Sequence, residues 1–485
     1  MLQCKDINKI DELKTRFTPA WVEPDFIKSS LKSFSFSSLC NCISPLKLKG
    51  YSIELILSIL ISIPFVESVT VNSMLGNYVH GFLKAGKDTF YRLKNNPKVC
   101  WRLILWLFAN KFKQVAQDKS STNQQSGSSL QCLVFDDTVI QKTGRFIEKV
   151  SRVWDHVTGR YILGFKMLLM GYWDGTSFIP VDFSLHREHG KNKEKPFGLK
   201  KREMKRQYKK PREKGSCTHE REKEADMSKI ESAIKMFKRA IGQGFHVDYV
   251  LMDSWFTCEA FIEAIQQVKK QTVNLIGMYK IARTKFCYNG QDLTYSQIRN
   301  QLGKAKRCRK LKLYYKEAIV IYNEKAIKLC FSKQGKNGKW KVFLCTDTKL
   351  TFIKMIEIYQ TRWTIEVFFK ESKQLLDLGK CQSNDFDAHI ADITITMIQH
   401  MLLTLRYRFD NYESKGGLFR DIKTEMVQQR LNQRLWGLFI ELIRIIELLF
   451  EDIDHEQLMI KIFNDDRANQ LILKLLEPNC NKYAA

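Results

Sequence analysis

The sequence predicts an α/β protein whose core is interrupted by a β-rich segment and flanked by helical regions. Three observations predict this class. Short apolar runs alternate with amphipathic helical segments between residues 130 and 270, turn-separated strands fill residues 271–346, and helical periodicity dominates both the first 118 residues and the chain after residue 347. Strands that alternate with helices are typical of layered α/β folds.

The core strands are expected at apolar runs, and the helices at segments with one apolar face. The predicted strands of the core are 130–135, 161–174, 177–185 and 247–252, with helices at 227–242 and 256–270. In the β-rich segment the predicted strands are 272–280, 311–322, 326–332 and 339–345, and one long helix is expected at 353–378.

A chain of 485 residues corresponds to roughly three folding units. The polar stretch DKSSTNQQSGSS predicts a linker, and the mixture of basic and aromatic residues at 87–98 favours a DNA-end reader over a helical cap with solvated lysines. We expect a helical N-terminal DNA-binding domain (1–118), a linker (119–129), the core's first part (130–270), a β-rich insertion domain (271–346), the core's helical second part (347–410) and a helical C-terminal region for dimerisation (411–485).

The charge balance indicates a polyanionic partner. Lys and Arg number 79 against 52 Asp and Glu, which leaves a net charge of +27. Nucleic acid is the first candidate, because neutralising phosphates releases counterions, and an anionic membrane surface is the second. No apolar run approaches the roughly 20 residues that a membrane span needs, and the N-terminus has no apolar signal core, so we expect an intracellular protein without a membrane partner.

The basic stretch 187–224 has two interpretations. It is either a segment that follows the DNA backbone or a solvated loop with helical pieces. The scattered cysteines are expected to be reduced, and Trp154, Trp173 and Trp255 are expected in the core.

Three carboxylates carry the predicted chemistry. Asp136 and Asp253 each follow a buried strand, at the strand end where α/β folds place ligand sites. Glu366 lies on the predicted helix 353–378, and Tyr359, Arg362 and Lys373 fall with it in a sector of roughly 60°. The alternative interpretation of this stripe is an ordinary surface row of paired charges.

Carboxylates without a matching His or Cys cluster indicate a hard-metal site for Mg²⁺ or Mn²⁺. Two such ions can activate the attacking oxygen and stabilise the leaving oxygen of a phosphodiester. Arg362 can then make paired hydrogen bonds to a phosphate, Lys373 supplies a point charge, and Tyr359 a directional hydroxyl.

The stripe Tyr359, Arg362, Glu366 and Lys373 reads Y-x2-R-x3-E-x6-K and resembles the signature of the DDE transposases of the insertion-sequence-4 family. The resemblance covers about residues 85–410. The family's first acidic residue usually lies in D-x-T or D-x-S, which matches Asp136-Asp137-Thr138 and favours Asp136 over Asp137 as the ligand. Asp253 matches the second acidic residue.

The resemblance implies an RNase H-like core and cut-and-paste transposition in a bacterial cytoplasm, in association with the nucleoid. It implies two divalent ions per site, double-stranded transposon ends and target DNA as partners, and a homodimer in the synaptic complex. The expected steps are nicking by water, formation of a DNA hairpin, hairpin opening and strand transfer. Tyr359, Arg362 and Lys373 would hold the 5′ phosphate of the non-transferred strand.

The resemblance also suggests two aromatic contacts to DNA. Trp363 either stacks on DNA or packs its helix, and Trp340 either stabilises a flipped base or is an ordinary strand aromatic. Two other functions stay open: a different RNase H-like metal nuclease, which needs neither the Tyr/Arg/Lys stripe nor a β insert, and a non-catalytic transposon-derived DNA-binding protein, which would be expected to have lost a carboxylate.

Overall fold

The computed structural model describes residues 25–46, 49–66, 70–77, 86–121, 130–280 and 284–425, with 461, 464–467 and 470. The chain divides into two compact units. Most of the predicted linker 119–129 and most of the predicted C-terminal region 411–485 lie outside the described residues. Among the described residues, no helix is long and apolar enough to cross a membrane.

The smaller unit comprises residues 1–32, 54–90 and 411–485. Phe65 lies at its centre, with ring centroids 5.3 Å from Phe26 and 5.4 Å from Phe419. Its described helices, some of which end just inside the larger unit, are α2 (Asp25–Ser33), α4 (Ile53–Ser62), α5 (Val71–Asn77) and α6 (Lys87–Lys94).

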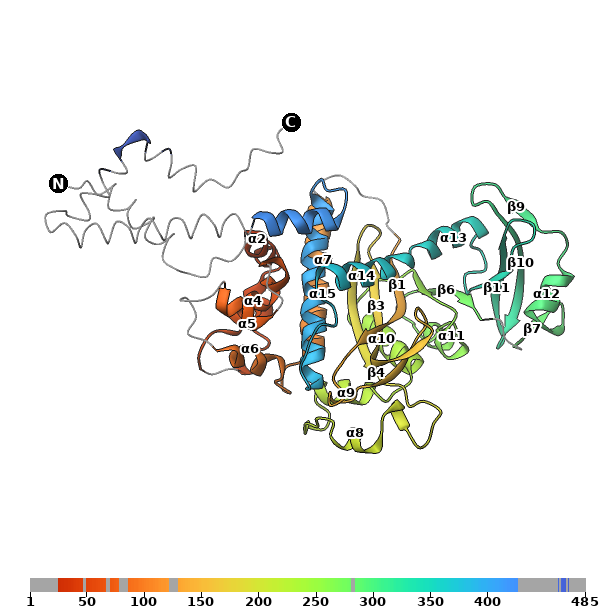
Figure 1. Cartoon of the computed structure of the whole chain (residues 1–485). Helices are drawn as coiled ribbons and strands as arrows, with labels where there is room; N and C mark the ends of the chain where they lie inside the picture. Colours follow the sequence, from red (N-terminus) through yellow and green to blue (C-terminus); the bar gives the residue numbers. More distant parts are fainter. Residues whose placement is uncertain are drawn as a thin grey trace. The chain divides into compact units, whose positions relative to one another are not determined.

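The larger unit, residues 33–53 and 91–410, is built on a mixed sheet (Figure 1). β3 pairs antiparallel with β1, and β1, β5 and β6 then run parallel to one another. β2 and β4 both pair with β3. The mixed α/β class is therefore confirmed. The strands are β1 (Cys132–Gln141), β2 (Ser151–Asp155), β3 (Arg160–Trp173), β4 (Phe178–His186), β5 (Tyr249–Met252) and β6 (Asn274–Tyr279).

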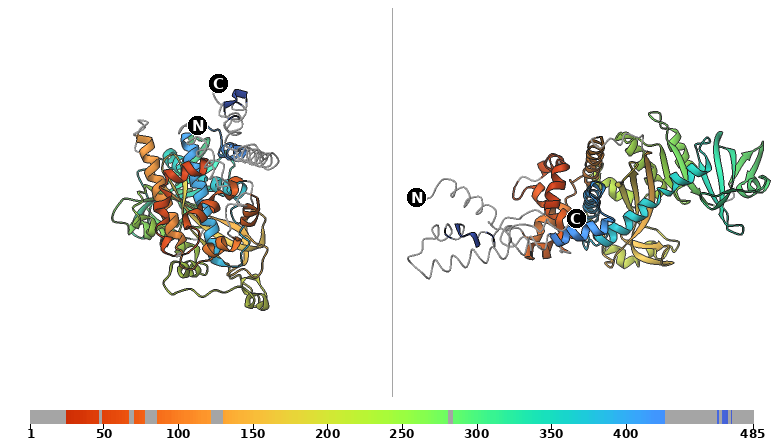
Figure 2. Two further views of the ribbon diagram at one scale, coloured as in Figure 1. Left: turned by 90° about the vertical axis from the view of Figure 1, so that its left-hand side faces the viewer. Right: turned by 90° about the horizontal axis from the view of Figure 1, so that it is seen from above.

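Helices cover both faces of β4, since every residue of this strand is buried. α7 (Trp101–Ser121) and α15 (Phe386–Phe409) lie side by side and pack on β4 (Figures 1 and 2). α10 (Lys229–Gly242) packs on β3 and β4 and against α11 (Glu259–Gln266). α7 therefore belongs to the larger unit, although the sequence places it in the N-terminal region.

The strands after β6 continue the same sheet, because β12 (Lys341–Cys345) pairs antiparallel with β6. β11 and β10 follow in order beyond β12. The remaining elements are α3 (Phe36–Cys40) near the start of the unit and, after β6, β7 (Lys285–Tyr288), β8 (Gln291–Thr294), α12 (Tyr295–Gln301), β9 (Lys306–Cys308), β10 (Leu313–Tyr322) and β11 (Lys325–Gln334).

The single long helix predicted at 353–378 is wrong. Two helices are present, α13 (Phe352–Gln360) and α14 (Trp363–Leu375). Between them Thr361 N donates to Ile358 O at 3.1 Å and Arg362 N donates to Tyr359 O at 3.0 Å. These three-residue spacings are hydrogen bonds of the 3₁₀ type, and they form one turn between the two helices.

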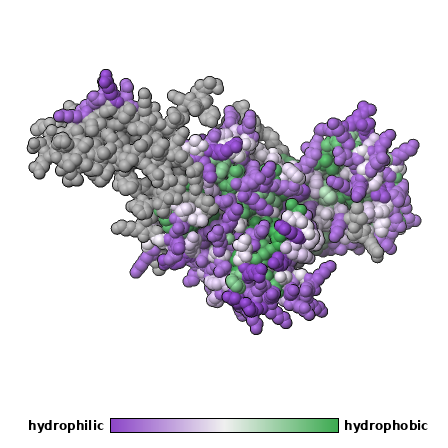
Figure 3. Space-filling view, viewed as in Figure 1, coloured by the Kyte–Doolittle hydropathy of each residue, from purple (hydrophilic) through white to green (hydrophobic). Residues whose placement is uncertain are grey.

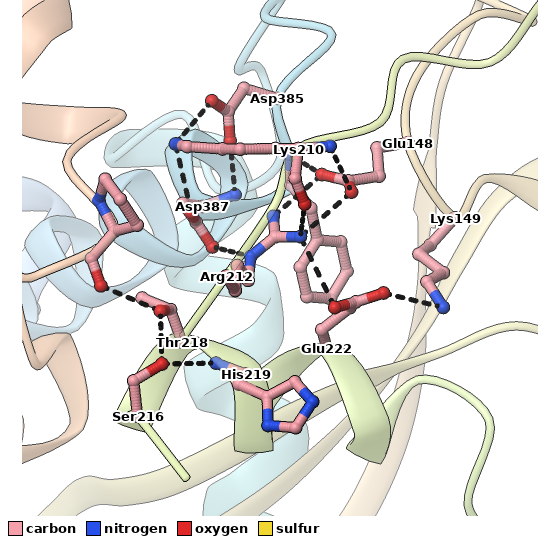
Figure 4. A network of polar contacts seen from close by, with 12 residues as sticks. Glu148, Lys149, Lys210, Arg212, Ser216, Thr218, His219, Glu222, Asp385 and Asp387 are labelled. Carbon is pink, nitrogen blue, oxygen red and sulfur yellow. Dashed lines mark hydrogen bonds and ion pairs between the residues drawn. The ribbon is translucent and has the colours of Figure 1, made fainter. Parts of the chain in front are cut away.

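The basic stretch 187–224 is partly anchored in the interior (Figure 4). The Arg212 side chain has no exposed surface; its Nη2 lies 2.7 Å from Glu148 Oε2 and its Nε 3.0 Å from Asp387 Oδ1. Lys210 Nζ lies 2.8 Å from Asp385 Oδ2. These cations neutralise carboxylates of β1–β2 and α15, so they are not available to DNA phosphates. The stretch also contains α8 (Lys201–Lys205) and α9 (Cys217–Glu224).

Other cations of the stretch remain at the surface, and Figure 3 shows hydrophilic residues over most of the described surface in that view.

The expectation that all cysteines are reduced is wrong for one pair. Cys100, just before α7, and Cys217, the first residue of α9, form a disulfide with a Cα–Cα separation of 5.5 Å.

Replacing Arg212 with Ala is expected to destabilise the larger unit by about 3–5 kcal/mol, because Glu148 and Asp387 would be left buried without a cation. Denaturant unfolding of the two proteins measures this loss. Arg202→Ala on exposed α8 is the control and is expected to change stability by less than about 0.5 kcal/mol. An Arg212→Ala protein as stable as the control would contradict the role of this ion network.

Candidate active site

Two of the predicted carboxylates lie side by side where β1 and β5 run parallel. The register pairs Phe135 of β1 with Met252 of β5, so the residues that follow them, Asp136 and Asp253, lie next to each other. Neighbouring strands are about 4.8 Å apart and paired residues direct their side chains to the same face. The charge of Asp253 accordingly helps to raise the pKa of Asp136.

Arg362 joins Asp136 to Glu366. Its Nη1 lies 2.8 Å from Asp136 Oδ2, and its Nη2 lies 2.5 Å from Glu366 Oε1. The 3₁₀ turn before α14 places the guanidinium between a strand carboxylate and a helix carboxylate. The structure thus sets Asp136 beside Asp253 and links Asp136 to Glu366 through Arg362, although these residues are far apart in sequence.

Burial raises the pKa of Asp136 to about 7, the effect of Arg362 opposes the shift, and the negative charge of Asp253 adds to it. A carboxylate pair of this kind holds its negative charge at a free-energy cost unless a cation is near. The side chains of Asp136 and Arg362 are mostly buried, whereas that of Glu366 is 30% exposed. The pair is therefore an electrostatic site that favours bound cations.

Tyr359 packs against the end of β5, next to Asp253. It is 9% exposed, and its hydroxyl donates to Met252 O, the last residue of β5, at 3.3 Å. Its ring packs edge-on against Phe343 of β12 with centroids 5.0 Å apart. Burial raises the pKa of Tyr359 to about 12. In this arrangement the hydroxyl is committed to the backbone beside Asp253 rather than open to a phosphate.

Lys373 connects α14 to the carboxyl-terminal half of β1. Its Nζ donates to Thr138 Oγ1 at 2.7 Å and to Val139 O at 3.2 Å. Burial lowers the pKa of Lys373. The ammonium group of Lys373 therefore contacts β1 two and three residues beyond Asp136.

Asp137, the alternative first ligand, has other partners. Lys166 Nζ lies 3.6 Å from its Oδ1, and Lys229 Nζ forms a second, close ion pair with Oδ2. Sequence reasoning missed both lysines. The only local signal is that Ser228 caps α10 by accepting from Glu231 N at 3.1 Å, which fixes Lys229 in the first turn.

A hydrogen-bonded turn holds Asp253 in place. Its Oδ1 accepts from Trp255 N at 2.9 Å and from Phe256 N at 3.3 Å, and its carbonyl accepts from Thr257 Oγ1 at 2.8 Å. Thr257 occupies the space beside Gly277, where a Cβ would lie 2.1 Å from Thr257 Oγ1. Because Gly277 of β6 has no side chain, Thr257 fits beside it and the turn at Asp253 can form.

The tryptophans differ in position. Trp363, the first residue of α14, is 62% exposed. Trp340 is partly exposed, and its ring is 5.0 Å from Lys333 Nζ and 5.8 Å from the guanidinium carbon of Arg299. The prediction that Trp255 belongs to the core is wrong, because 53% of it is exposed; the buried neighbour Phe256 fills the core position instead.

The donors fit a hard divalent cation by their chemistry, since all are carboxylates. Within the described part of the chain, however, no three acidic, His or Cys side chains are grouped closely enough to hold a metal ion. Arg362 contacts both Asp136 and Glu366. Its Nε is buried and makes no hydrogen bond among the described residues, so the guanidinium is not fixed through all of its donors.

Asp136 lies within β1, because this strand continues to Gln141, whereas Asp253 directly follows β5 and Glu366 lies on α14. The expectation that Asp136 lies at a strand end is therefore wrong, although its neighbour Asp253 does follow one.

Two family models match the chain. The DDE superfamily endonuclease model matches residues 86–279, and the transposase DDE domain model matches residues 217–402. Together the two matches include Asp136, Asp253 and Glu366. No curated protein matches the chain. Both matches support a DDE transposase enzyme, and DDE domains imply an RNase H-like core.

Replacing Gly277 with Ala is expected to destabilise the protein by about 1–3 kcal/mol, because the new Cβ displaces Thr257 and with it the turn at Asp253. Thermal unfolding measures the effect. Gly242→Ala is the matched control: its Cβ meets nothing within 4 Å, and in α10 alanine is expected to be neutral or stabilising. Equal melting temperatures for the two variants would contradict the packing role of Gly277.

Proposed function

We propose that the chain is a cut-and-paste transposase of the insertion-sequence-4 type, with Asp136, Asp253 and Glu366 as its catalytic carboxylates. One observation carries the proposal: Arg362 binds Asp136 and Glu366 at once, while the register of β1 and β5 sets Asp253 beside Asp136. The separate ion pairs of Asp137 support Asp136 as the first ligand.

Asp136, Asp253 and Glu366 would hold two Mg²⁺ or Mn²⁺ ions. When bound, such ions activate the attacking oxygen and stabilise the leaving oxygen of a phosphodiester. The Oδ1 of Asp253 is held by backbone N–H groups, which leaves Oδ2 for this role. The fixed turn keeps that carboxylate in place without a contribution from α14.

Arg362 exchanges partners in this proposal. Its guanidinium pairs with Asp136 and Glu366, and on DNA binding it would turn to phosphate oxygens, which its planar donors match in pairs. Lys373 supplies a second positive charge beside β1. Tyr359 acts mainly by supporting the end of β5, and its contact to the 5′ phosphate requires it to leave Met252 O.

The proposed reaction proceeds on double-stranded transposon ends. Water attacks the phosphodiester and frees a 3′-hydroxyl, which attacks the opposite strand to form a hairpin; the hairpin is then opened and the end is joined to target DNA. A homodimer, assembled through residues 411–485, would hold two ends together. Residues 1–118 would bind end DNA.

Residues 271–346 would form the insertion domain that reaches the hairpin. The ring of Trp340, which lies near Lys333 and Arg299, supports a base contact there, because unstacked bases require an aromatic partner and phosphates require cations. Trp363, exposed at the start of α14, is proposed to stack on DNA. A simple nuclease with the same carboxylates would cut DNA but would form neither hairpins nor joined products.

Glu366→Gln is expected to retain binding to end DNA but to lose hairpin formation and strand transfer by about 10³-fold or more, since the change removes a charge that acts on the reacting phosphate. The measurement is gel analysis of labelled transposon ends with Mg²⁺, together with a binding assay. The ends come from the inverted repeats that flank the gene.

Glu357→Gln is the matched control, because this carboxylate lies on α13 and pairs with the exposed Lys310 at 2.5 Å. It is expected to cleave like the unmodified protein. Cleavage by Glu366→Gln at the unmodified rate would remove Glu366 from the catalytic site. Cleavage without hairpins by the unmodified protein would favour the simple nuclease.

A further inference from the structure

Trp255 is held outward beside the carboxylates. The Asp253 carboxylate accepts from the backbone N–H of Trp255 at 2.9 Å and of Phe256 at 3.3 Å, so the turn after β5 is fixed. Phe256 is 1% exposed and anchors the turn in the core, whereas Trp255 is 53% exposed. A large apolar ring is thus presented to solvent on a rigid support, two residues from a catalytic carboxylate.

Two ammonium groups from separate elements lie at this ring. Lys229 Nζ, at the start of α10, is 5.0 Å from the indole centroid, and Lys280 Nζ, directly after β6, is 5.7 Å from it. Lys229 also pairs with Asp137, the neighbour of Asp136. The aromatic ring and its two cations therefore border the site on the side of β1 and β5.

Cation–π contacts alone explain why the lysines approach the ring, but they do not explain why so much of the indole stays exposed. An exposed aromatic ring flanked by cations is the chemistry that binds single-stranded nucleic acid. Every base has a π-face that stacks on such a ring, and the ammonium groups bind the adjoining phosphates. Bases inside a duplex have both faces covered and cannot use the ring.

We propose that Trp255, Lys229 and Lys280 form a subsite for one unpaired nucleotide of the bound DNA strand. The base stacks on Trp255 without preference for its identity, and an adjoining phosphate lies against the exposed Lys280, while Lys229 stays paired with Asp137 and packs on the ring. The inference depends on the proposed function, because it assumes that DNA occupies the adjacent carboxylate site. It adds a stacking position separate from Trp340 and Trp363, in the core sheet itself.

The test compares two fluorescent DNA probes in EDTA, so that no cleavage occurs. One is a blunt duplex, and the other is the same duplex with a single-stranded tail of three thymidines. Trp255→Leu is expected to weaken binding of the tailed probe by about 5- to 150-fold, the range for loss of one base–aromatic stack, and to change blunt-duplex binding less than about twofold. Trp255→Phe should retain most of the affinity.

Tyr161→Leu is the matched control, because this aromatic residue is 55% exposed but lies at the start of β3. It should bind both probes normally. Lys280→Gln should reduce the salt dependence of tailed-probe binding by roughly one phosphate contact. Melting temperatures of all variants should match, since each side chain is exposed.

The outcomes separate the two proposals. If the unmodified protein binds neither probe, the proposed function fails. If it binds both probes but Trp255→Leu binds the tailed one equally well, or loses both probes equally, the subsite is wrong while the proposed function stands.

Discussion

The paired contact of Arg362 with Asp136 and Glu366 is the interaction on which the site depends. Each carboxylate comes from a different layer, one from β1 and one from α14, and the guanidinium holds them at 2.8 and 2.5 Å. Burial and the charge of Asp253 raise the pKa of Asp136 to about 7 although Arg362 opposes the shift, so removal of the guanidinium would favour the protonated form further. The arginine therefore opposes the cost of burying the Asp136 carboxylate.

The same principle organises the positive charge of the rest of the larger unit. Arg212 and Lys210 neutralise buried carboxylates, and so do Arg102 and Arg239, which lie 3.3 and 2.8 Å from the buried carboxylate of Asp182. The count of 79 Lys and Arg residues thus overstates the number of cations that DNA can reach. What remains for DNA is the set of exposed cations, some of which stand beside exposed aromatic rings such as Trp255 and Trp340.

The sequence predicts the parts of the site that local pattern determines. Apolar runs end at Asp136 and Asp253, and this pattern selects both residues from the sequence. The strand end is real only at Asp253, because β1 continues past Asp136 to Gln141 in its pairing with β3. The α/β class follows from the same alternation. The spacing of Tyr359, Arg362 and Glu366 likewise indicated a shared site.

Long-range contacts could not be predicted in this way. Arg362 and Asp136 are 226 residues apart, and nothing in either segment says that the guanidinium fills the space between two carboxylates. Helical periodicity continues through Thr361, so the 3₁₀ turn is invisible to it. In the sequence Arg212 resembles any other cation of a basic stretch. Only the fold shows that it is buried against the carboxylates of Glu148 and Asp387. A tryptophan directly after a buried strand is expected in the core, but the neighbouring Phe256 occupies the core and Trp255 is exposed.

The most direct measurement of the central claim is a crystal structure of the protein with Mn²⁺, using anomalous scattering to locate the ions. We expect anomalous peaks in contact with Asp136 and Asp253, with Glu366 nearby and the Arg362 guanidinium turned away from Asp136. Mn²⁺ located away from these carboxylates, with the Arg362 ion pairs unchanged, would contradict the assignment of the site.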